Sequence, residues 1–437
     1  MTLDYLTIVV LLGTSLLGGV AGVTGTFAVL RRRALVGDVL AHAALPGLCL
    51  AFLLLGALHF AGLVVGALLS GLIGLGLITL MCNGTRTKED AALGIVLSTF
   101  FGVGIVLLSI VQQRATGGQA GLNSYIFGQA SVMVRQDVYL IGAVSATALI
   151  VIVLLYKELK LLSFDPGFAR AQGWPTFTLD LGLMGVLALV TVIGLPAVGV
   201  VLMAAMLILP GATARFWTDR LGHMLILAGL VGAGSAAAAT LISAGLLEAW
   251  LGLDPFAFGD TSVNLPTGPL IVVCGTAALL FSVAFSPRRG VIAALANTVR
   301  LRWRTGLEHL LSTMYELSEG QPTARPAVPL KAVLERRAWR PWQARAILWW
   351  ASRRGLVELR DGSAGLTQRG AVHAVQVVRA HRLWELFLIH GADIAPDHVH
   401  RDADAIEHLL PPETIEHLEA VLAETGKMPG PMHGDND

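Results

Sequence analysis

The sequence predicts an all-α polytopic membrane domain followed by a small α+β domain, and three observations carry this prediction. The chain of 437 residues is 54% hydrophobic and 14% charged, with a mean hydropathy of +0.69. Such a composition is too apolar for a soluble enzyme and typical of an integral membrane protein. The charge is uneven, with 24 charged residues before Pro287 and 37 after it. Long apolar runs recur only in the first part. We therefore expect a transmembrane domain over 1–287, a linker over 288–304 and a soluble domain over 305–437.

The first domain contains nine apolar runs that fit the roughly 20 residues needed to cross a bilayer as a helix. They cover residues 5–30, 38–58, 60–81, 90–111, 137–156, 178–195, 197–214, 222–247 and 267–286. Short or broken helices would change the count, so we expect eight to ten transmembrane helices. The N-terminus, MTLDYLTIVVLLG, has no basic region before its apolar run, which predicts a first span and not a cleaved signal.

Basic residues between the spans predict the orientation of the domain, since cytoplasmic loops are rich in Lys and Arg. Most basic loop positions fall on one side of the nine-span scheme, and Arg114 and Arg135 are the exceptions. The basic positions on the expected cytoplasmic side are Arg31–Arg33, Arg86, Lys88, Lys157, Lys160, Arg170, Arg215, Arg220, Arg288 and Arg289. This arrangement places the soluble domain in the cytoplasm.

The stretch GDVLAHAALPG places an acid and a histidine at the start of an apolar run. Asp38 and His42 are four residues apart and share one face of a helix. Pro46 lies four residues further on and has no N–H, so the carbonyl of His42 loses its helical partner. Carboxylate, imidazole and carbonyl groups suit a divalent first-row metal such as Mn²⁺, Fe²⁺ or Zn²⁺. An Asp–His pair near the membrane surface, bonded to itself or to water, is the alternative.

The chain after Pro287 has the outline of a winged helix. Residues 305–319 form an amphipathic helical pattern, and the Pro-rich segment 321–329 ends it. Two further helical patterns follow, and the Asp-Gly pair in VELRDGSAGLT predicts a short hairpin over 357–367. A long helical pattern follows over 371–391, and the segment DADAIEHLL begins another. A helix-turn-helix followed by a hairpin predicts a small α+β winged-helix domain with additional helices.

Four blocks of the membrane domain, in order, resemble the membrane subunits of the zinc/manganese/iron family of ABC importers. They are GDVLAHAALPGLCLAFLL, EDAALGIVLSTFFGVGIVLLS, AVGVVLMAAMLILPGATARFW and NLPTGPLIVV. The resemblance covers about residues 5–287 and implies that Asp38 and His42 lie on the path of a transported metal. It implies no permanently bound cofactor. Mn²⁺ is the favoured cargo, with Zn²⁺ and Fe²⁺ as alternatives.

The segment DPGFARAQGWP, residues 165–175, resembles the short coupling helix that docks on the ATPase in such importers. The matching positions are Arg170, Gln172 and Gly173. An ordinary amphipathic loop is the alternative interpretation of this segment.

The chain contains no GxxxxGK[ST] motif, since Gly426 and Lys427 are followed by Met428. The phosphate-binding loop of P-loop ATPases is therefore missing. We expect a permease subunit that is not itself an enzyme and that works with a separate cytoplasmic ATPase. The resemblance also implies an external metal-binding protein, a second permease subunit and a location in the bacterial cytoplasmic membrane.

The segments AHRLWELFL and DADAIEHLL resemble the metal-sensing and dimerisation domain of the diphtheria-toxin-repressor family of manganese and iron regulators. His381, Asp404, Glu407 and His408 fall on family ligand positions and suggest a regulatory metal site. Two further family ligands fall at about His309 and Ser312, and serine is a poor ligand for these metals. A surface histidine cluster without metal is the alternative. A membrane-bound domain is badly placed to scan DNA, so we expect a regulatory or dimerising role in preference to DNA binding.

Two other classes of function remain compatible with these observations. One is a membrane-tethered, metal-responsive transcription regulator, in which the spans only sense metal. The other is a secondary transporter that works without ATP. Retention of DNA by the C-terminal domain would favour the first, and the absence of an ATPase partner would favour the second.

Overall fold

The computed structural model describes residues 4–55, 60–113, 128, 130, 133–245, 266–318, 327–336, 339, 341–360, 362–391, 413 and 420. The chain divides into two compact units, residues 1–294 and residues 295–437. Each unit has its own hydrophobic core.

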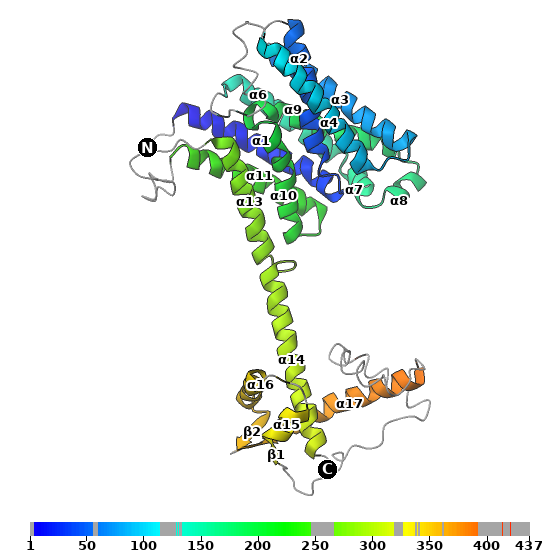
Figure 1. Ribbon diagram of the computed structural model, residues 1–437, viewed down its shortest axis with the longest axis vertical. Coiled ribbons are helices and arrows are strands. Elements are labelled where there is room, and N and C mark those ends of the chain that lie inside the picture. The colour runs from blue at the N-terminus through cyan, green and yellow to red at the C-terminus, as the bar shows by residue number, and fades with distance from the viewer. Residues whose placement is uncertain are drawn as a thin grey trace. The chain divides into compact units, whose positions relative to one another are not determined.

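The first unit is entirely helical in its described residues (Figure 1). Its helices are α1 (Tyr5–Leu30), α2 (Val36–Leu55), α3 (Phe60–Gly84), α4 (Glu89–Gln113), α6 (Arg135–Leu154), α7 (Tyr156–Phe164), α8 (Pro166–Ala171), α9 (Thr176–Val198), α10 (Val200–Trp217), α11 (Leu221–Ser243) and α13 (Thr267–Phe285). Within the described ranges, eight are long and apolar enough to cross a membrane, and residues 202–217 of α10 form a shorter apolar helix. These positions confirm the prediction of a polytopic helical domain.

Helix α1 runs through the middle of this unit and packs along α11 and α10. A Cβ atom on Gly18 would lie 2.4 Å from the carbonyl oxygen of Gly232, so the two backbones touch at this point. Small residues allow this approach, and close packing replaces the hydrophobic effect as the force that joins helices in lipid. The glycine-rich sequence of α1 therefore explains its central position.

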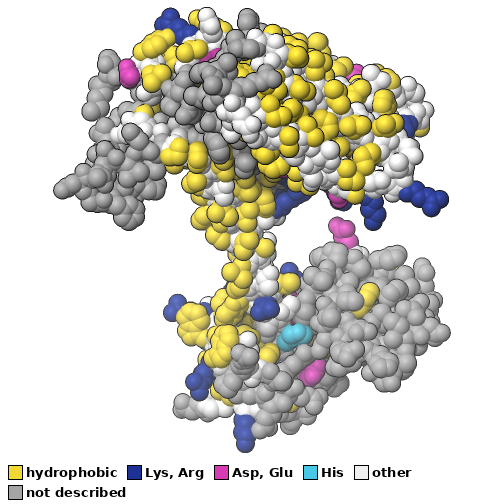
Figure 2. Space-filling view, turned by 45° about the horizontal axis from the view of Figure 1, so that its top comes forward, with side chains coloured by type: hydrophobic (Ala, Val, Ile, Leu, Met, Phe, Trp, Pro, Cys, Tyr) yellow, Lys and Arg dark blue, Asp and Glu magenta, His cyan; other side chains and the backbone are white. Residues whose placement is uncertain are grey.

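Helix α2 packs against α3, α4, α9 and α10. Gly47 of α2 and Gly66 of α3 meet in the same way as the α1–α11 pair, because a Cβ on Gly66 would lie 2.5 Å from the carbonyl oxygen of Gly47. The first half of α2 is largely buried. Large apolar side chains such as Leu54, Leu80 and Leu154 are exposed on the outer surface of the unit, where Figure 2 shows broad hydrophobic areas. A bilayer would cover such a surface.

The second unit combines helices with a small antiparallel sheet. Its elements are α14 (Val291–Ser318), which begins in the first unit, β1 (Ala327–Pro329), α15 (Leu330–Arg336), α16 (Pro341–Arg353), β2 (Val357–Arg360), β3 (Ser363–Leu366) and α17 (Gln368–Gly391). The strand order is β1-β3-β2, and both pairings are antiparallel. Leu310, Leu311, Met314, Val333 and Ala351 lie in a core shared by α14, α15 and α16. This arrangement confirms the predicted small α+β domain with a helix-turn-helix and a hairpin.

Helix α14 is longer than the amphipathic pattern from which the sequence predicts it. It begins at Val291 and continues without a break to Ser318, so it includes most of the expected linker over 288–304. The residues around 300 are basic and apolar in alternation and contain no proline or glycine before Gly306. Nothing in that composition ends a helix, which explains why the helix extends toward its N-terminus.

Candidate functional site

Asp38 and His42 face each other on the first turns of α2, as the sequence predicts for residues four apart. The Nε2 atom of His42 lies 3.5 Å from Oδ1 of Asp38. Their side chains are 16% exposed for His42 and 30% exposed for Asp38, so the imidazole is the more deeply buried group. The pair therefore lies at the margin of a buried apolar helix face and remains partly accessible.

The neighbouring helices α3 and α4 complete the surroundings of the pair. The ring of Phe101 on α4 meets the imidazole of His42 edge to face, with ring centroids 5.0 Å apart. Ser70 of α3 donates a hydrogen bond of 2.6 Å to the carbonyl of Ala43, one residue after the histidine. Pro46 lies inside α2 and leaves the His42 carbonyl without the usual i+4 donor. These contacts orient the histidine and hold α2 against its neighbours.

The second ring nitrogen of His42 is a candidate ligand atom. Among the described residues, Nδ1 of His42 is buried and has no hydrogen-bond partner. A buried polar atom without a partner costs free energy, and such atoms are rare unless they serve a ligand, a water molecule or a proton. A carboxylate with a nearby imidazole forms an incomplete set of ligands for a divalent transition metal. An incomplete set fits a cargo that binds and leaves better than a permanently held ion.

The turn between α1 and α2, which precedes Asp38, is fixed by ion pairs to two other helices. Arg31 and Arg33 both pair with Asp180 of α9, the Arg33 pair at 2.8 Å. Arg33 also contacts Glu89, the first residue of α4, at 2.5 Å. Burial alone lowers the pKa of the Arg33 guanidinium, but Asp180 and Glu89 outweigh it and the pKa is raised. The guanidinium therefore stays charged, and the start of α2 is tied to α4 and α9.

The segment 165–175 forms the short helix α8 and an ordered turn. Asp165 caps the helix by accepting a hydrogen bond of 2.9 Å from the backbone N–H of Phe168. Gly173 adopts a φ of 82°, a left-handed conformation that favours glycine, and ends the helix. Nε of Arg170 donates to the hydroxyl of Thr176 at 3.3 Å, and Gln172 is exposed. Phe168 and Trp174 are about half exposed, so this segment presents aromatic side chains outward.

The predicted regulatory metal site is only partly within the described residues. His381 lies on α17 and is half-buried, whereas Asp404, Glu407 and His408 lie outside the described residues. His309 and Ser312 lie on α14, and the buried Ser312 hydroxyl donates to the carbonyl of His309 at 3.1 Å. Within the described part of the chain, no group of three or more His, Cys, Asp and Glu residues could hold a metal ion.

Several contacts around the site could not be found by reading α2 alone. Phe101, Ser70 and the carboxylates of Asp180 and Glu89 come from other helices and have no fixed spacing from Asp38 in the sequence. One signal was present, because an acid near the end of an apolar run is costly unless it is paired. Asp180 fits that description.

Comparison with known proteins agrees with this architecture. Residues 3–253 match the model of the ABC 3 transport family, and residues 367–432 match the metal binding and dimerisation domain of iron dependent repressors. The chain is 39% identical to the manganese transport system membrane protein MntC of Bacillus subtilis (strain 168), over 98% of this chain and 94% of that protein. It is also 39% identical to the zinc transport system membrane protein TroC of Treponema pallidum (strain Nichols), over 67% of this chain and 93% of that protein.

A solved structure shares the fold of the membrane unit. It is that of PsaBC from Streptococcus pneumoniae in complex with Fab, which superposes with a TM-score of 0.55 at 29% identity and covers 66% of this chain and 94% of that chain. The family match extends over more than half of the sequence and includes Asp38, His42 and the segment 165–175. The chain therefore belongs to the ABC 3 transport family, and it carries a C-terminal region similar to the metal binding and dimerisation domain of iron dependent repressors.

Proposed function

We propose that this chain is the membrane subunit of an ABC importer that moves a divalent transition metal into the cytoplasm. The observation that carries the proposal is the Asp38–His42 pair on α2, with its atoms 3.5 Å apart and a buried imidazole nitrogen that has no partner among the described residues. Asp38 and His42 provide a transient binding position for the metal. Two side chains bind weakly enough for release, whereas a complete ligand shell would retain the ion.

Manganese is the favoured cargo, and zinc and iron are the alternatives. A carboxylate ligand suits Mn²⁺, and imidazole suits all three ions, so the donor atoms alone do not decide among them. A relative that shares almost the full length of this chain is named as a manganese transport protein, and another relative is named as a zinc transport protein. The C-terminal region matches a domain of iron dependent repressors, which keeps iron among the alternatives.

The energy for transport comes from a separate ATPase in this proposal. Helix α8 and its turn, with Arg170, Gln172 and Gly173, form the surface that docks on it, because exposed aromatic side chains flank these residues on an otherwise polar segment. A second permease subunit, an external metal-binding protein and a cytoplasmic location of the C-terminal domain complete the arrangement. The basic turns at Arg31–Arg33 and Arg288–Arg289 support that orientation.

The test is metal uptake by the complex reconstituted in vesicles with its ATPase. Replacement of Asp38 or His42 by alanine removes half of the donor set, so we expect uptake of radioactive Mn²⁺ to fall at least roughly tenfold, as changes at metal sites commonly do. Co-purification of the ATPase should be unchanged, because neither side chain belongs to α8. Competition by Zn²⁺ and Fe²⁺ in the same assay identifies the preferred cargo.

Matched controls are available in the same domain. His223 at the start of α11 and Asp4 before α1 are both exposed, and His223→Ala and Asp4→Asn should leave uptake near the wild-type rate. Wild-type uptake by the Asp38→Ala/His42→Ala double variant would exclude a metal path through this pair. ATP-independent uptake would exclude the ABC mechanism and favour a secondary transporter.

A further inference from the structure

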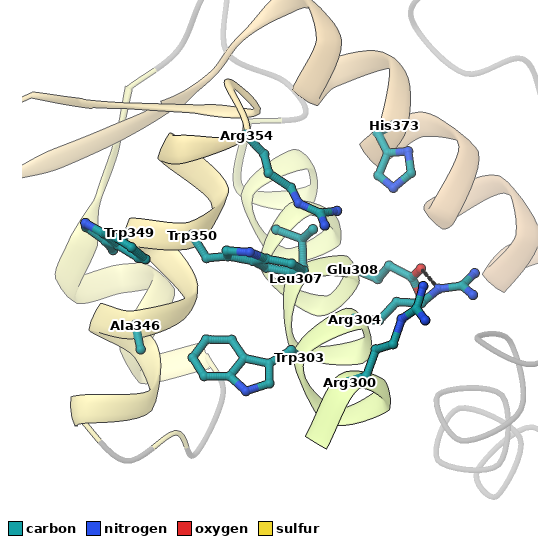
Figure 3. Close-up of a pocket in the computed structure, with 10 residues that line it drawn as sticks. All are labelled: Arg300, Trp303, Arg304, Leu307, Glu308, Ala346, Trp349, Trp350, Arg354 and His373. Carbon is teal, nitrogen blue, oxygen red and sulfur yellow. Dashed lines mark hydrogen bonds and ion pairs between the residues drawn. The ribbon is translucent and has the colours of Figure 1, made fainter. Parts of the chain in front are cut away.

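A large pocket lies within the second unit, between α14, α16 and the first turns of α17. Its volume is about 750 Å³, in the range of roughly 300–1,000 Å³ that is usual for small-molecule sites. Figure 3 shows the side chains that line it. Among the described residues, neither the Asp38–His42 pair nor His381 lines this pocket.

Arginine side chains dominate the polar lining of the pocket. Arg300 and Arg304 come from α14, and Arg354 comes from the residue after α16 (Figure 3). Arg304 pairs with Glu308 at 2.9 Å. Within the described part of the chain, neither Arg300 nor Arg354 is paired with a carboxylate. The pocket therefore has an excess of positive charge, with Glu308 as the acidic residue of its lining.

The stretch of sequence between the first and the last arginine of the pocket is also basic. From Arg300 to Arg354 the chain contains eleven Lys and Arg residues and four Glu residues, and no Asp. A net positive segment of this kind attracts anions from solution.

Tryptophan side chains form the apolar wall of the same pocket. Trp303 of α14 and Trp350 of α16 meet edge to face, with ring centroids 6.1 Å apart. The guanidinium of Arg354 lies over the ring of Trp350, 4.0 Å from its centroid. Stacking on the indole fixes the direction of the guanidinium, so less entropy is lost when it binds an anion. His373 of α17 adds an imidazole on the Arg354 side of the pocket in Figure 3.

We propose that this pocket binds a phosphate-bearing organic ligand, with the phosphate held by Arg300 and Arg354 and the apolar or aromatic part lying against Trp303 and Trp350. Guanidinium groups match phosphate oxygens in charge and in geometry, and two of them can bind one phosphate from two sides. A bare phosphate ion would fill only a small part of the volume, which is why the ligand needs an organic body. Since α14 and α16 both contribute, the bound ligand joins the long helix to the helix-turn-helix.

Two kinds of ligand combine a phosphate with an organic part, a soluble nucleotide and the headgroup of an anionic phospholipid. The experiment uses the full-length protein in detergent and isothermal titration with three ligands: ADP, dioctanoyl phosphatidylglycerol and dioctanoyl phosphatidylcholine. Binding of ADP alone identifies a nucleotide site. Binding of phosphatidylglycerol without phosphatidylcholine identifies an anionic lipid site.

Arginine variants test the assignment of the site. We expect Arg300→Gln and Arg354→Gln each to weaken binding roughly tenfold or more, because each removes charge-assisted hydrogen bonds to the phosphate. Arg354→Lys keeps the charge and loses the planar fork, so binding should be intermediate. Arg360→Gln is the matched control, since Arg360 lies on the exposed β2 strand outside the pocket and its loss should change affinity less than twofold.

Several results would overturn the proposal. Absence of binding by both ADP and phosphatidylglycerol in the wild-type protein would do so. Equal weakening by Arg360→Gln and Arg354→Gln would show that only diffuse charge attracts the ligand. Tight binding of duplex DNA, with no binding of either small ligand, would assign the basic residues to nucleic acid.

Melting curves of each variant establish that the fold is retained. Trp303→Leu provides a charge-neutral variant that should also weaken binding.

Discussion

At the residue scale, the turn before Asp38 determines how firmly the candidate metal pair is held. Arg33 contacts Asp180 at 2.8 Å and Glu89 at 2.5 Å, and Arg31 shares the same aspartate. The side chains of Arg33 and Asp180 are each about three-quarters buried, so their charges are poorly solvated when unpaired. Breaking such a pair costs more than breaking an exposed one, because the remaining charge stays partly buried.

Asp180→Asn should therefore destabilise the membrane unit. It leaves two guanidinium groups without their shared carboxylate, and we expect a loss of about 1–3 kcal/mol, seen as a lower melting temperature in detergent. Asp219→Asn is the matched control, because Asp219 is 48% exposed and its pairs with Arg215 and Arg289 are near the surface. That variant should lose less than about 1 kcal/mol. Equal melting temperatures for both variants would contradict the structural importance of the buried pair.

At the element scale, the contact between α2 and α3 positions the helix that carries Asp38 and His42. Gly66 approaches Gly47 so closely that a methyl group on Gly66 would lie 2.5 Å from a backbone oxygen, and backbone cannot move aside as a flexible side chain can. Gly76, on the same helix α3, has open space where its Cβ would lie. The two glycines thus form a matched pair for mutation.

Gly66→Ala should push α2 away from α3, lower the melting temperature and reduce metal uptake. An overpacked contact of this kind costs about 1–3 kcal/mol. Gly76→Ala should be neutral or slightly stabilising, since alanine favours the helix by about 1 kcal/mol over glycine. Both variants are compared by thermal melting and by vesicle uptake. Full uptake by Gly66→Ala would show that the α2–α3 contact does not position the metal pair.

The short helix α8 offers a second prediction at this scale. A substitution at Gly173 cannot test docking of the ATPase cleanly, because a φ of 82° strains any side chain there and the turn itself would change. Trp174→Ala is sharper, since this indole is 42% exposed and its loss leaves the backbone turn intact. We expect weaker co-purification of the ATPase and lower uptake. Tyr139→Ala is the control, because Tyr139 lies on α6, outside α8, and is 74% exposed. This variant should retain both co-purification of the ATPase and metal uptake.

At the scale of the whole molecule, the region similar to a repressor domain comes after the membrane unit in the chain, and α14 begins in the first unit and continues into the second. Its match to a metal binding and dimerisation domain covers His381, Asp404, Glu407 and His408. If imported metal fills a site there, the domain can restrain transport at high cytoplasmic metal. An allosteric coupling of about 1–3 kcal/mol would change transport roughly 5- to 150-fold.

The prediction is that only the full-length protein slows at high internal Mn²⁺. A chain that ends at Gly290, just before α14 begins, should transport at the same rate at low and high internal metal. Glu407→Ala with His408→Ala should relieve the slowing in the full-length chain. Dissociation of the complex after truncation, with the metal response unchanged, would instead identify the domain as an assembly device. Uptake is measured in vesicles loaded with Mn²⁺ before the external metal is added.

The amino-acid sequence was enough to predict the two-part organisation, the apolar helices, the winged-helix outline and the shared helix face of Asp38 and His42. Those features depend on local patterns, namely hydropathy over one helix, a four-residue spacing and a turn dipeptide. The packing of the helices, in contrast, places Phe101 and Ser70 beside the pair and pairs Asp180 with the basic turn. The same packing brings Arg300, Trp303 and Arg354 into one pocket. Helix α14 also includes most of the expected linker. The residues that meet around the pair and in the pocket are far apart in the chain, so the packing of whole helices decides their contacts. The extension of α14 has a different reason, because no local signal in the sequence stops the helix.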